Sequence, residues 1–230
     1  MPAKNTLKPY IENSYYHIYN RGVEKRIIFI DEQDYRVFLS YLKVYLSPEN
    51  LCQGDSFTNI PRRRPLNNFY QKIDLLAYCL MPNHFHLLLK QKPADGIEKF
   101  MRSIGTKFVQ YFNRRYDRVG PLFQNTYKAV LIESDEQLLH LSRYIHLNPL
   151  GDNKNNKKES PLQARLLSTY SSYADYLGKR KTLWVQPKEI SSFFKTAQRT
   201  NLKDILSYQS FVEDYSQPPE ELLGDLILEM

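Results

Sequence analysis

Two histidines separated by one residue are the side chains of this sequence best suited to chemistry. His84 and His86 lie within residues 73–91, where apolar runs flank a Met-Pro-Asn break at 81–83. This pattern predicts two strands joined by a tight turn, with the histidines opening the second strand. Because residues i and i+2 of a strand share one face, the two imidazoles can hold a metal ion together. A packing role for the histidines is the alternative.

A tyrosine and an asparagine on a predicted helix can complete such a site. His140, Tyr144 and Asn148 are spaced four residues apart, so they fall near one face of that helix. If this face looks toward the sheet, a phenol and an amide oxygen approach the imidazoles. Two histidines and one oxygen ligand leave coordination positions open, as a catalytic metal requires. A cation held there can polarise a phosphodiester while a tyrosine attacks phosphorus.

The tyrosine cannot be chosen from composition, because the chain has 18 of them. Tyr111 and Tyr116 are alternatives to Tyr144, although Tyr111 lies in an apolar stripe. A phenol is a weak nucleophile at neutral pH, since its pKa is ordinarily about 10, so a metal and nearby basic groups must stabilise the charge. His140 and His146 are expected to be surface or packing residues.

Strands and helices alternate in an order that predicts an α+β fold with an antiparallel sheet. Asp31 is the expected N-cap of the first helix and Ser134 that of the third. Pro149 is expected to stop the third helix at Asn148. The predicted elements are a strand at 15–20, a helix from 31 to 46, the hairpin at 73–91, a helix at 96–116, a strand at 122–133 and a helix from 134 to 148.

The polar stretch at 151–160 predicts a linker, so we expect residues 1–150 to form the main domain and residues 151–230 a linker with a C-terminal helical extension. Residues 47–71 have no period and contain three prolines and the cluster Arg62 to Arg64, so they predict a long loop. Its arginines either contact phosphate or form a solvated charge run. In the extension, apolar residues are expected to pack on the main domain: Phe193, Phe194, Leu202, Ile205, Leu206 and Phe211.

Charge and aromatic content favour a polyanionic partner. The chain has a net charge of +7, 18 Tyr and 12 Phe, a combination that suits single-stranded nucleic acid. Cys52 and Cys79 form neither a disulfide framework nor a thiolate metal site. With no signal peptide and no membrane-spanning apolar run, a soluble cytoplasmic protein is expected. The absence of a phosphate-binding glycine loop argues against a nucleotide-dependent enzyme.

Five stretches together resemble the HUH-type single-tyrosine transposases, in particular the REP-associated tyrosine transposases of the IS200-like group. They extend over most of the first 180 residues. These stretches are YYHIYNRG (15–22), AYCLMPNHFHLLL (77–89), GPLFQNTYKAVLI (120–132), RYIHLNP (143–149) and SSYADYLG (171–178).

The resemblance implies a role for each part of the site. His84 and His86 become ligands of a divalent metal, Tyr144 the nucleophile and Asn148 a further ligand, although an asparagine at a helix end is also an ordinary cap. The implied fold is the ferredoxin-like, RRM-like sandwich. The implied activity is cleavage of single-stranded DNA at hairpins or palindromic repeats through a 5′-phosphotyrosine, with later rejoining. The metal would be Mg²⁺ or Mn²⁺, with manganese the better match to imidazole.

Further residues are candidates for DNA contact. Asn20 and Arg21 end the first predicted strand, where a role in stabilising the turn is the alternative. Tyr127 and Lys128 lie on the last predicted strand. The exposed side of the second predicted helix adds basic residues: Arg102, Lys107, Arg114 and Arg115.

Two other functions stay open at this point. One is a binding module or repressor on the same fold that has lost catalysis, and the other is a metallohydrolase that activates water. The resemblance also allows a homodimer in which one subunit supplies the tyrosine to its partner.

Overall fold

The computed structural model describes residues 10–49, 67–155, 161–195 and 207–214. Its centre is a four-stranded antiparallel sheet with the order β2-β3-β1-β4. The strands are β1 (Tyr15–Arg21), β2 (Ile73–Met81), β3 (His84–Gln91) and β4 (Lys128–Ile132). The long helices are α1 (Glu32–Leu46), α2 (Gly96–Arg115) and α3 (Asp135–Leu147). The predicted α+β, ferredoxin-like fold is confirmed.

Local signals in the sequence set the helix starts as predicted. The Asp31 carboxylate accepts hydrogen bonds from the backbone N–H groups of Gln33 and Asp34, which fixes the start of α1. Ser134 Oγ accepts from the Gln137 N–H at 3.2 Å. The Gln137 side chain in turn accepts from the Glu133 N–H at 2.9 Å, so α3 starts with a reciprocal cap.

One predicted strand boundary is wrong, whereas the predicted end of the third helix at Asn148 is confirmed, since α3 ends at Leu147 with Asn148 as its C-cap. The strand predicted at 122–133 covers only 128–132, because Phe123 meets Gly22 in an isolated bridge and not in a ladder. Asn148 keeps helical φ and ψ of −52° and −40°, and its N–H bonds to the Tyr144 carbonyl. The chain then tightens into η4 (Asn148–Asn155), whose first turn accepts Pro149 because no N–H is needed there. Asn148 therefore stays in line with α3.

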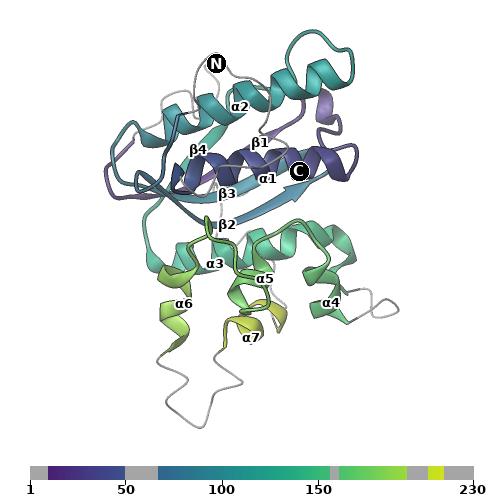
Figure 1. Ribbon diagram of the computed structural model, residues 1–230. Helices are drawn as coiled ribbons and strands as arrows, with labels where there is room; N and C mark the ends of the chain where they lie inside the picture. The colour runs from purple at the N-terminus through teal and green to yellow at the C-terminus, as the bar shows by residue number, and fades with distance from the viewer. Residues whose placement is uncertain (1–9, 50–66, 156–160, 196–206, 215–230) are drawn as a thin grey trace, which may run out of the picture.

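Alternation along the strands divides the core between two sides of the sheet. On β3, Phe85, Leu87 and Leu89 belong to the core under α1 and α2, whereas Leu88 belongs to the core under α3. Figure 1 shows α1 and α2 on one side of the sheet and α3 with the short C-terminal helices on the other. His84 and His86 alternate with Phe85 and so face the α3 side.

The C-terminal part of the chain covers that second side. Its helices are α4 (Leu162–Leu167), α5 (Tyr173–Tyr176), α6 (Lys188–Lys195) and α7 (Tyr208–Glu213). Tyr173, Ile190 and Val212 are fully buried in the same core as Leu141 and Ile145 of α3. Residues 170–186 also bond to the outer edge of β2, including Ser172 N–H to the Tyr78 carbonyl and Gln186 N–H to the Leu75 carbonyl. This pairing protects an otherwise open sheet edge.

Several sequence predictions for the loop and extension lie outside the described residues: Arg62 to Arg64, Leu202, Ile205 and Leu206. Among the others, Phe194 and Phe211 pack against the α3 core as expected, whereas Phe193 is 42% exposed. The division at residue 150 stays a prediction.

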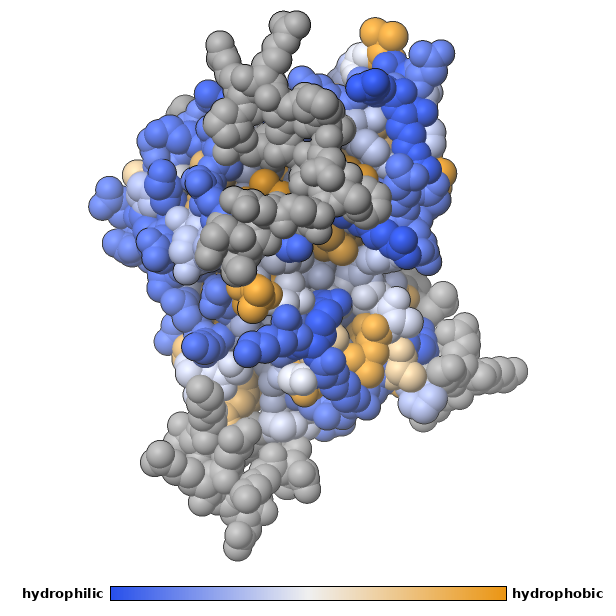
Figure 2. Space-filling view, in the orientation of Figure 1, coloured by the Kyte–Doolittle hydropathy of each residue, from blue (hydrophilic) through white to orange (hydrophobic). Residues whose placement is uncertain are grey.

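The face of the molecule shown in Figure 2 is mostly polar. On the face in Figure 2, hydrophilic side chains cover most of the described surface, and apolar ones form small separate patches. In the described part of the chain, no helix has the length and apolar character required to cross a membrane.

A first prediction concerns Gly22, which is buried where the chain leaves β1. A Cβ at this position would lie 2.3 Å from the Arg26 carbonyl oxygen and 2.8 Å from Ile28 Cγ2. We expect Gly22→Ala to lower the free energy of unfolding by about 1–3 kcal/mol, measured by urea denaturation. Gly105→Ala is the control, because a Cβ there meets nothing within 4 Å. Equal losses in the two variants would contradict the steric explanation.

A second prediction concerns the division of the chain. Ending the chain at residue 160 would remove Tyr173, Ile190 and Val212, which are fully buried in the same core as Leu76 and Leu88. We expect the shortened protein to aggregate and to lose cooperative unfolding, because apolar area would be returned to water. Size-exclusion chromatography and thermal melting measure this. A monomer with the melting temperature of the full chain would establish residues 1–150 as an independent domain.

Candidate metal and nucleophile site

The site begins with the register between β1 and β3. Arg21 lies opposite His84, and Tyr19 lies opposite His86. Directly paired residues of antiparallel strands share one face, so these four side chains gather on the α3 side of the sheet. The prediction that the two histidines share a face is confirmed. Lys128 joins them from β4, where it lies opposite Tyr19.

Helix α3 brings Tyr144 and Asn148 to the histidines. The centroid of the Tyr144 ring lies 5.6 Å from that of His86 with the planes nearly perpendicular. One turn later, Asn148 Oδ1 lies 3.3 Å from His84 Nε2. The third residue of the predicted face, His140, points elsewhere: it bonds to Arg143, and its ring centroid lies 5.7 Å from that of Phe211 on α7.

Buried His146 helps to fix α3 in this position. Its Nδ1 lies 2.7 Å from the Tyr208 hydroxyl and its Nε2 2.8 Å from Ser172 Oγ, so both ring nitrogens have partners. Burial and the charge of Arg180 lower the pKa of His146 to about 3, which keeps the ring neutral. The hydrogen bonds join α3 to α7 and to the segment that precedes α5.

Both histidines of the pair are neutral at pH 7. Burial and then the nearby Arg21 guanidinium lower the pKa of His84 to about 4. Burial, followed by the charges of His17, His84 and Arg21, holds the pKa of His86 well below its usual value. A neutral imidazole keeps a lone pair on one nitrogen, and this is the form that binds metal ions.

The hydrogen bonds indicate which nitrogens carry the lone pairs. His84 Nδ1 lies 2.6 Å from Asn83 Oδ1, an atom that only accepts, so the proton is on Nδ1. The lone pair of Nε2 then faces Asn148 Oδ1, another acceptor. His86 Nε2 is buried and has no hydrogen-bond partner in the described part of the chain. His84 Nε2, Asn148 Oδ1 and the unpartnered His86 Nε2 suit a shared cation, because each atom can offer a lone pair.

The donor set is less acidic than that of many metal sites. Within the described residues no group of three or more His, Cys, Asp and Glu side chains could hold a metal ion, so the amide of Asn148 would have to serve as the third ligand. Cys79 lies opposite His86 on β2, but burial raises the pKa of its thiol and disfavours a thiolate. The metal roles of His84, His86 and Asn148 stay predictions.

His17 is a candidate site residue that sequence reasoning missed. It is fully buried on β1, and its Nε2 lies 2.8 Å from His86 Nδ1. If His86 Nδ1 donates this hydrogen bond, the lone pair of His86 is on Nε2, the atom without a partner. Metal-binding histidines are commonly oriented in this way by a second group. Alternation within 15–20 places His17 on the face of Arg21, but only the strand register shows that it meets His86.

Tyr19 is a second tyrosine that sequence reasoning missed. Its ring centroid lies 5.8 Å from that of His86, about as close as that of Tyr144. Tyr19 is 8% exposed and lies on a central strand, whereas Tyr144 is half-buried on α3. Tyr111 and Tyr116, by contrast, lie on the far side of the sheet, where their hydroxyls both donate to the buried Asp34 carboxylate.

The candidates for DNA contact divide between the two faces. Arg21 and Lys128 lie beside the histidines, but Asn20, Arg102 and Tyr127 line a pocket on the α2 side. Arg115 forms ion pairs with Asp31 and Asp34 that connect α2 to α1. Lys107 and Arg114 lie on α2 and form no ion pair with any described residue. The DNA roles of all eight residues stay predictions.

The position of His17 leads to a third prediction. We expect His17→Leu to weaken Mn²⁺ binding about 10- to 100-fold, because His86 would lose the partner that orients it. His17→Gln should restore much of the affinity, since its side-chain oxygen can accept the same hydrogen bond. Calorimetric titration of Mn²⁺ measures this, with His140→Leu as a control away from the pair. Unchanged binding in His17→Leu would remove His17 from the site.

A comparison with known proteins found a match to the segment that carries the paired histidines and Tyr144. Residues 68–148 match the family model described as "Transposase IS200 like". A solved structure, "Structure of the REP associates tyrosine transposase bound to a REP hairpin", is 13% identical; the match covers 80% of this chain and 98% of that one, with a TM-score of 0.49. No curated protein matches. The matched segment is about a third of the chain, and it contains the histidine hairpin and the helix with Tyr144 and Asn148.

Proposed function

We propose that this protein cleaves and rejoins single-stranded DNA with Tyr144 as its nucleophile. The observation that carries the proposal is the approach of α3 to β3, with the Tyr144 ring against His86 and the Asn148 oxygen 3.3 Å from His84 Nε2. A phenol beside neutral imidazoles and an amide oxygen is the arrangement that metal-assisted transesterification uses. The match of residues 68–148 to a transposase family model supports this reaction class.

In the proposed reaction, the Tyr144 hydroxyl loses its proton, its Oη forms a bond to the phosphorus of a phosphodiester, and the bond from phosphorus to the 3′ oxygen breaks. The 3′ oxygen leaves as a hydroxyl after it takes a proton, and the 5′ phosphate stays on the tyrosine. Attack by a 3′-hydroxyl on that phosphate reverses the step and joins strands. Each step makes one phosphoester bond for the one it breaks, so no nucleotide is needed as an energy source.

His84, His86 and Asn148 would hold the divalent metal, Mg²⁺ or Mn²⁺, with manganese favoured by the imidazole donors. A cation bound there would polarise the scissile phosphodiester and offset the charge that develops on it. Arg21 offers a further contact to the phosphate. Its Nε is buried with no hydrogen-bond partner among the described residues, and a guanidinium matches the geometry of phosphate oxygens.

The branch of the family and the form of the DNA belong to the proposal as well. The five motif stretches resemble REP-associated tyrosine transposases, so a hairpin or palindromic repeat in single-stranded DNA is the proposed substrate. A homodimer that shares its tyrosines is compatible with this chemistry.

A fourth prediction tests the nucleophile. We expect Tyr144→Phe to abolish the covalent adduct that forms when the protein is incubated with end-labelled hairpin DNA and Mn²⁺. Phenylalanine keeps the ring against His86 but removes the attacking oxygen, so the melting temperature should stay near that of the unchanged protein. Denaturing gels detect the adduct.

Tyr19→Phe is the matched control, since Tyr19 also adjoins His86. It should leave the adduct in place. If the adduct persists in Tyr144→Phe and disappears in Tyr19→Phe, the nucleophile is Tyr19. Cleavage with no adduct would support a metallohydrolase, and binding without cleavage would support a binding module.

A further inference from the structure

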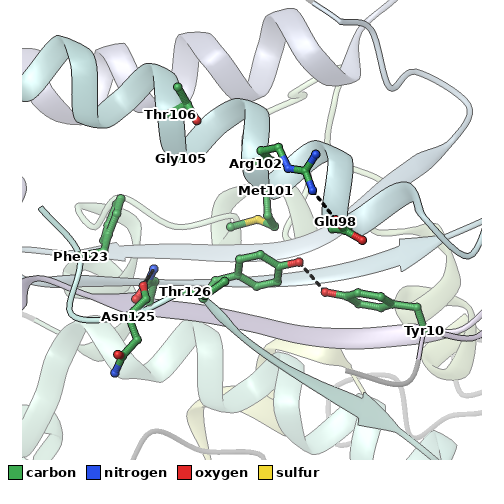
Figure 3. Close-up of a pocket in the computed structure, with 11 residues that line it drawn as sticks. Tyr10, Glu98, Met101, Arg102, Gly105, Thr106, Phe123, Asn125 and Thr126 are labelled. Atoms are coloured by element: carbon green, nitrogen blue, oxygen red, sulfur yellow. Dashed lines mark hydrogen bonds and ion pairs between the residues drawn. The ribbon is translucent and has the colours of Figure 1, made fainter. Parts of the chain in front are cut away.

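A pocket of about 570 Å³ lies on the side of the sheet away from the histidines, between α2 and the segment that leads into β4 (Figure 3). Asn20, Arg102 and Tyr127, from three separate elements, all line it. We propose that this pocket receives an unpaired base of the DNA strand. The inference rests on the proposed function, because it assigns a second contact to the same substrate.

The walls of the pocket fit a flat ring with a polar edge. Figure 3 shows Phe123 at one end and Tyr10 at the other, with Met101 reaching in from α2. Aromatic side chains and a thioether suit the face of a base, since stacking works for every base. Asn125 and Thr126 are exposed and offer both hydrogen-bond donors and acceptors to its edge.

The charge of the walls does not oppose a nucleic acid. Among the described residues that line the pocket, Glu98 is the acidic one, and it is ion-paired with Arg102 on the next turn of α2. The pair is neutral overall. The nearby strand end places Arg21 on the opposite face of the sheet, where it can contact a neighbouring phosphate of the same strand.

Gly105 widens the pocket on the helix side. A glycine inside a helix weakens it relative to alanine. Here no packing contact explains the glycine, since a Cβ would meet nothing within 4 Å. The missing side chain leaves open space between Arg102 and Thr106, which also line the pocket.

The end of β1 connects the pocket with the histidine site. Arg21 faces His84, whereas the preceding residue, Asn20, faces the pocket. Successive side chains of a strand point to opposite faces of the sheet. A DNA strand that passes the end of β1 can therefore place a phosphate on one face and the base of a nearby nucleotide on the other.

The test uses the full chain and two short fluorescent probes, oligothymidine and an abasic strand with the same number of phosphates. Gly105→Leu fills the pocket from the helix side. We expect it to weaken oligothymidine binding about tenfold, the loss of roughly one stacked base, and to leave binding of the abasic strand unchanged. Gln110→Leu is the matched control, because it adds the same side chain at an exposed position of α2 outside the pocket.

Three results would overturn the inference: unchanged oligothymidine binding in Gly105→Leu, an equal loss for both probes, or a wild-type protein that binds neither or does not distinguish them. Adduct formation on hairpin DNA is measured separately at saturating DNA. If no adduct forms while base-dependent binding is lost in Gly105→Leu, the proposed function fails and the pocket stands.

A second measurement keeps the inference testable if Gly105→Leu does not fold. Oligothymidine that carries 4-thiothymidine is irradiated on the wild-type protein, and the cross-linked peptides are identified by mass spectrometry. We expect cross-links at Met101, Phe123 or Tyr127. Cross-links confined to the histidine face would show that bases do not enter the pocket.

Discussion

The register between β1 and β3 is the constraint on which both the core and the candidate site depend. It places Arg21 opposite His84 and Tyr19 opposite His86, and it directs Phe85 and Leu87 into the core under α1 and α2. A slip of one residue would exchange these sets, so imidazoles would enter an apolar core and a phenylalanine would face Tyr144. The two-residue turn at 82–83 holds the register, since the Pro82 carbonyl accepts hydrogen bonds from the N–H groups of Ile28 and Phe29.

Burial on the α3 side gives the histidines their chemical state. Water is excluded because α3 and the C-terminal helices cover this face, and that exclusion, with the Arg21 charge, keeps His84 and His86 neutral. The cover is itself held by polar contacts inside it, above all the hydrogen bonds of His146 to Tyr208 and Ser172. The C-terminal part of the chain therefore determines the geometry of the site although it supplies none of the proposed ligands.

The sheet also separates residues that are adjacent in the sequence, because successive side chains of a strand lie on opposite faces. Arg21 lies with the histidines, while Asn20 lies with the pocket beside α2.

The basic residues of α2 differ in whether their charge is already paired. Arg102 and Arg115 are ion-paired, and Arg115 joins α2 to α1 through Asp31 and Asp34. A net charge of +7 therefore overstates the charge available to DNA on any one face.

Short-range patterns were sufficient to predict most of the fold and the central part of the site. Apolar runs on both sides of the Met-Pro-Asn break in 73–91 predicted the hairpin. The period of two residues in a strand predicted the shared face of His84 and His86, and the spacing of four residues placed Tyr144 and Asn148 on one side of a helix, because both periods are properties of the local backbone. Capping residues located the helix starts for the same reason. The sequence did not predict the isolated bridge at Phe123, the helical geometry of Asn148 before Pro149, or the bonds of His17 to His86 and of His146 to Tyr208. Each of these features depends on contacts between segments that are far apart in the chain. Such contacts depend on strand register and on how helices pack over the sheet, which no local period encodes, so only the tertiary structure decided them.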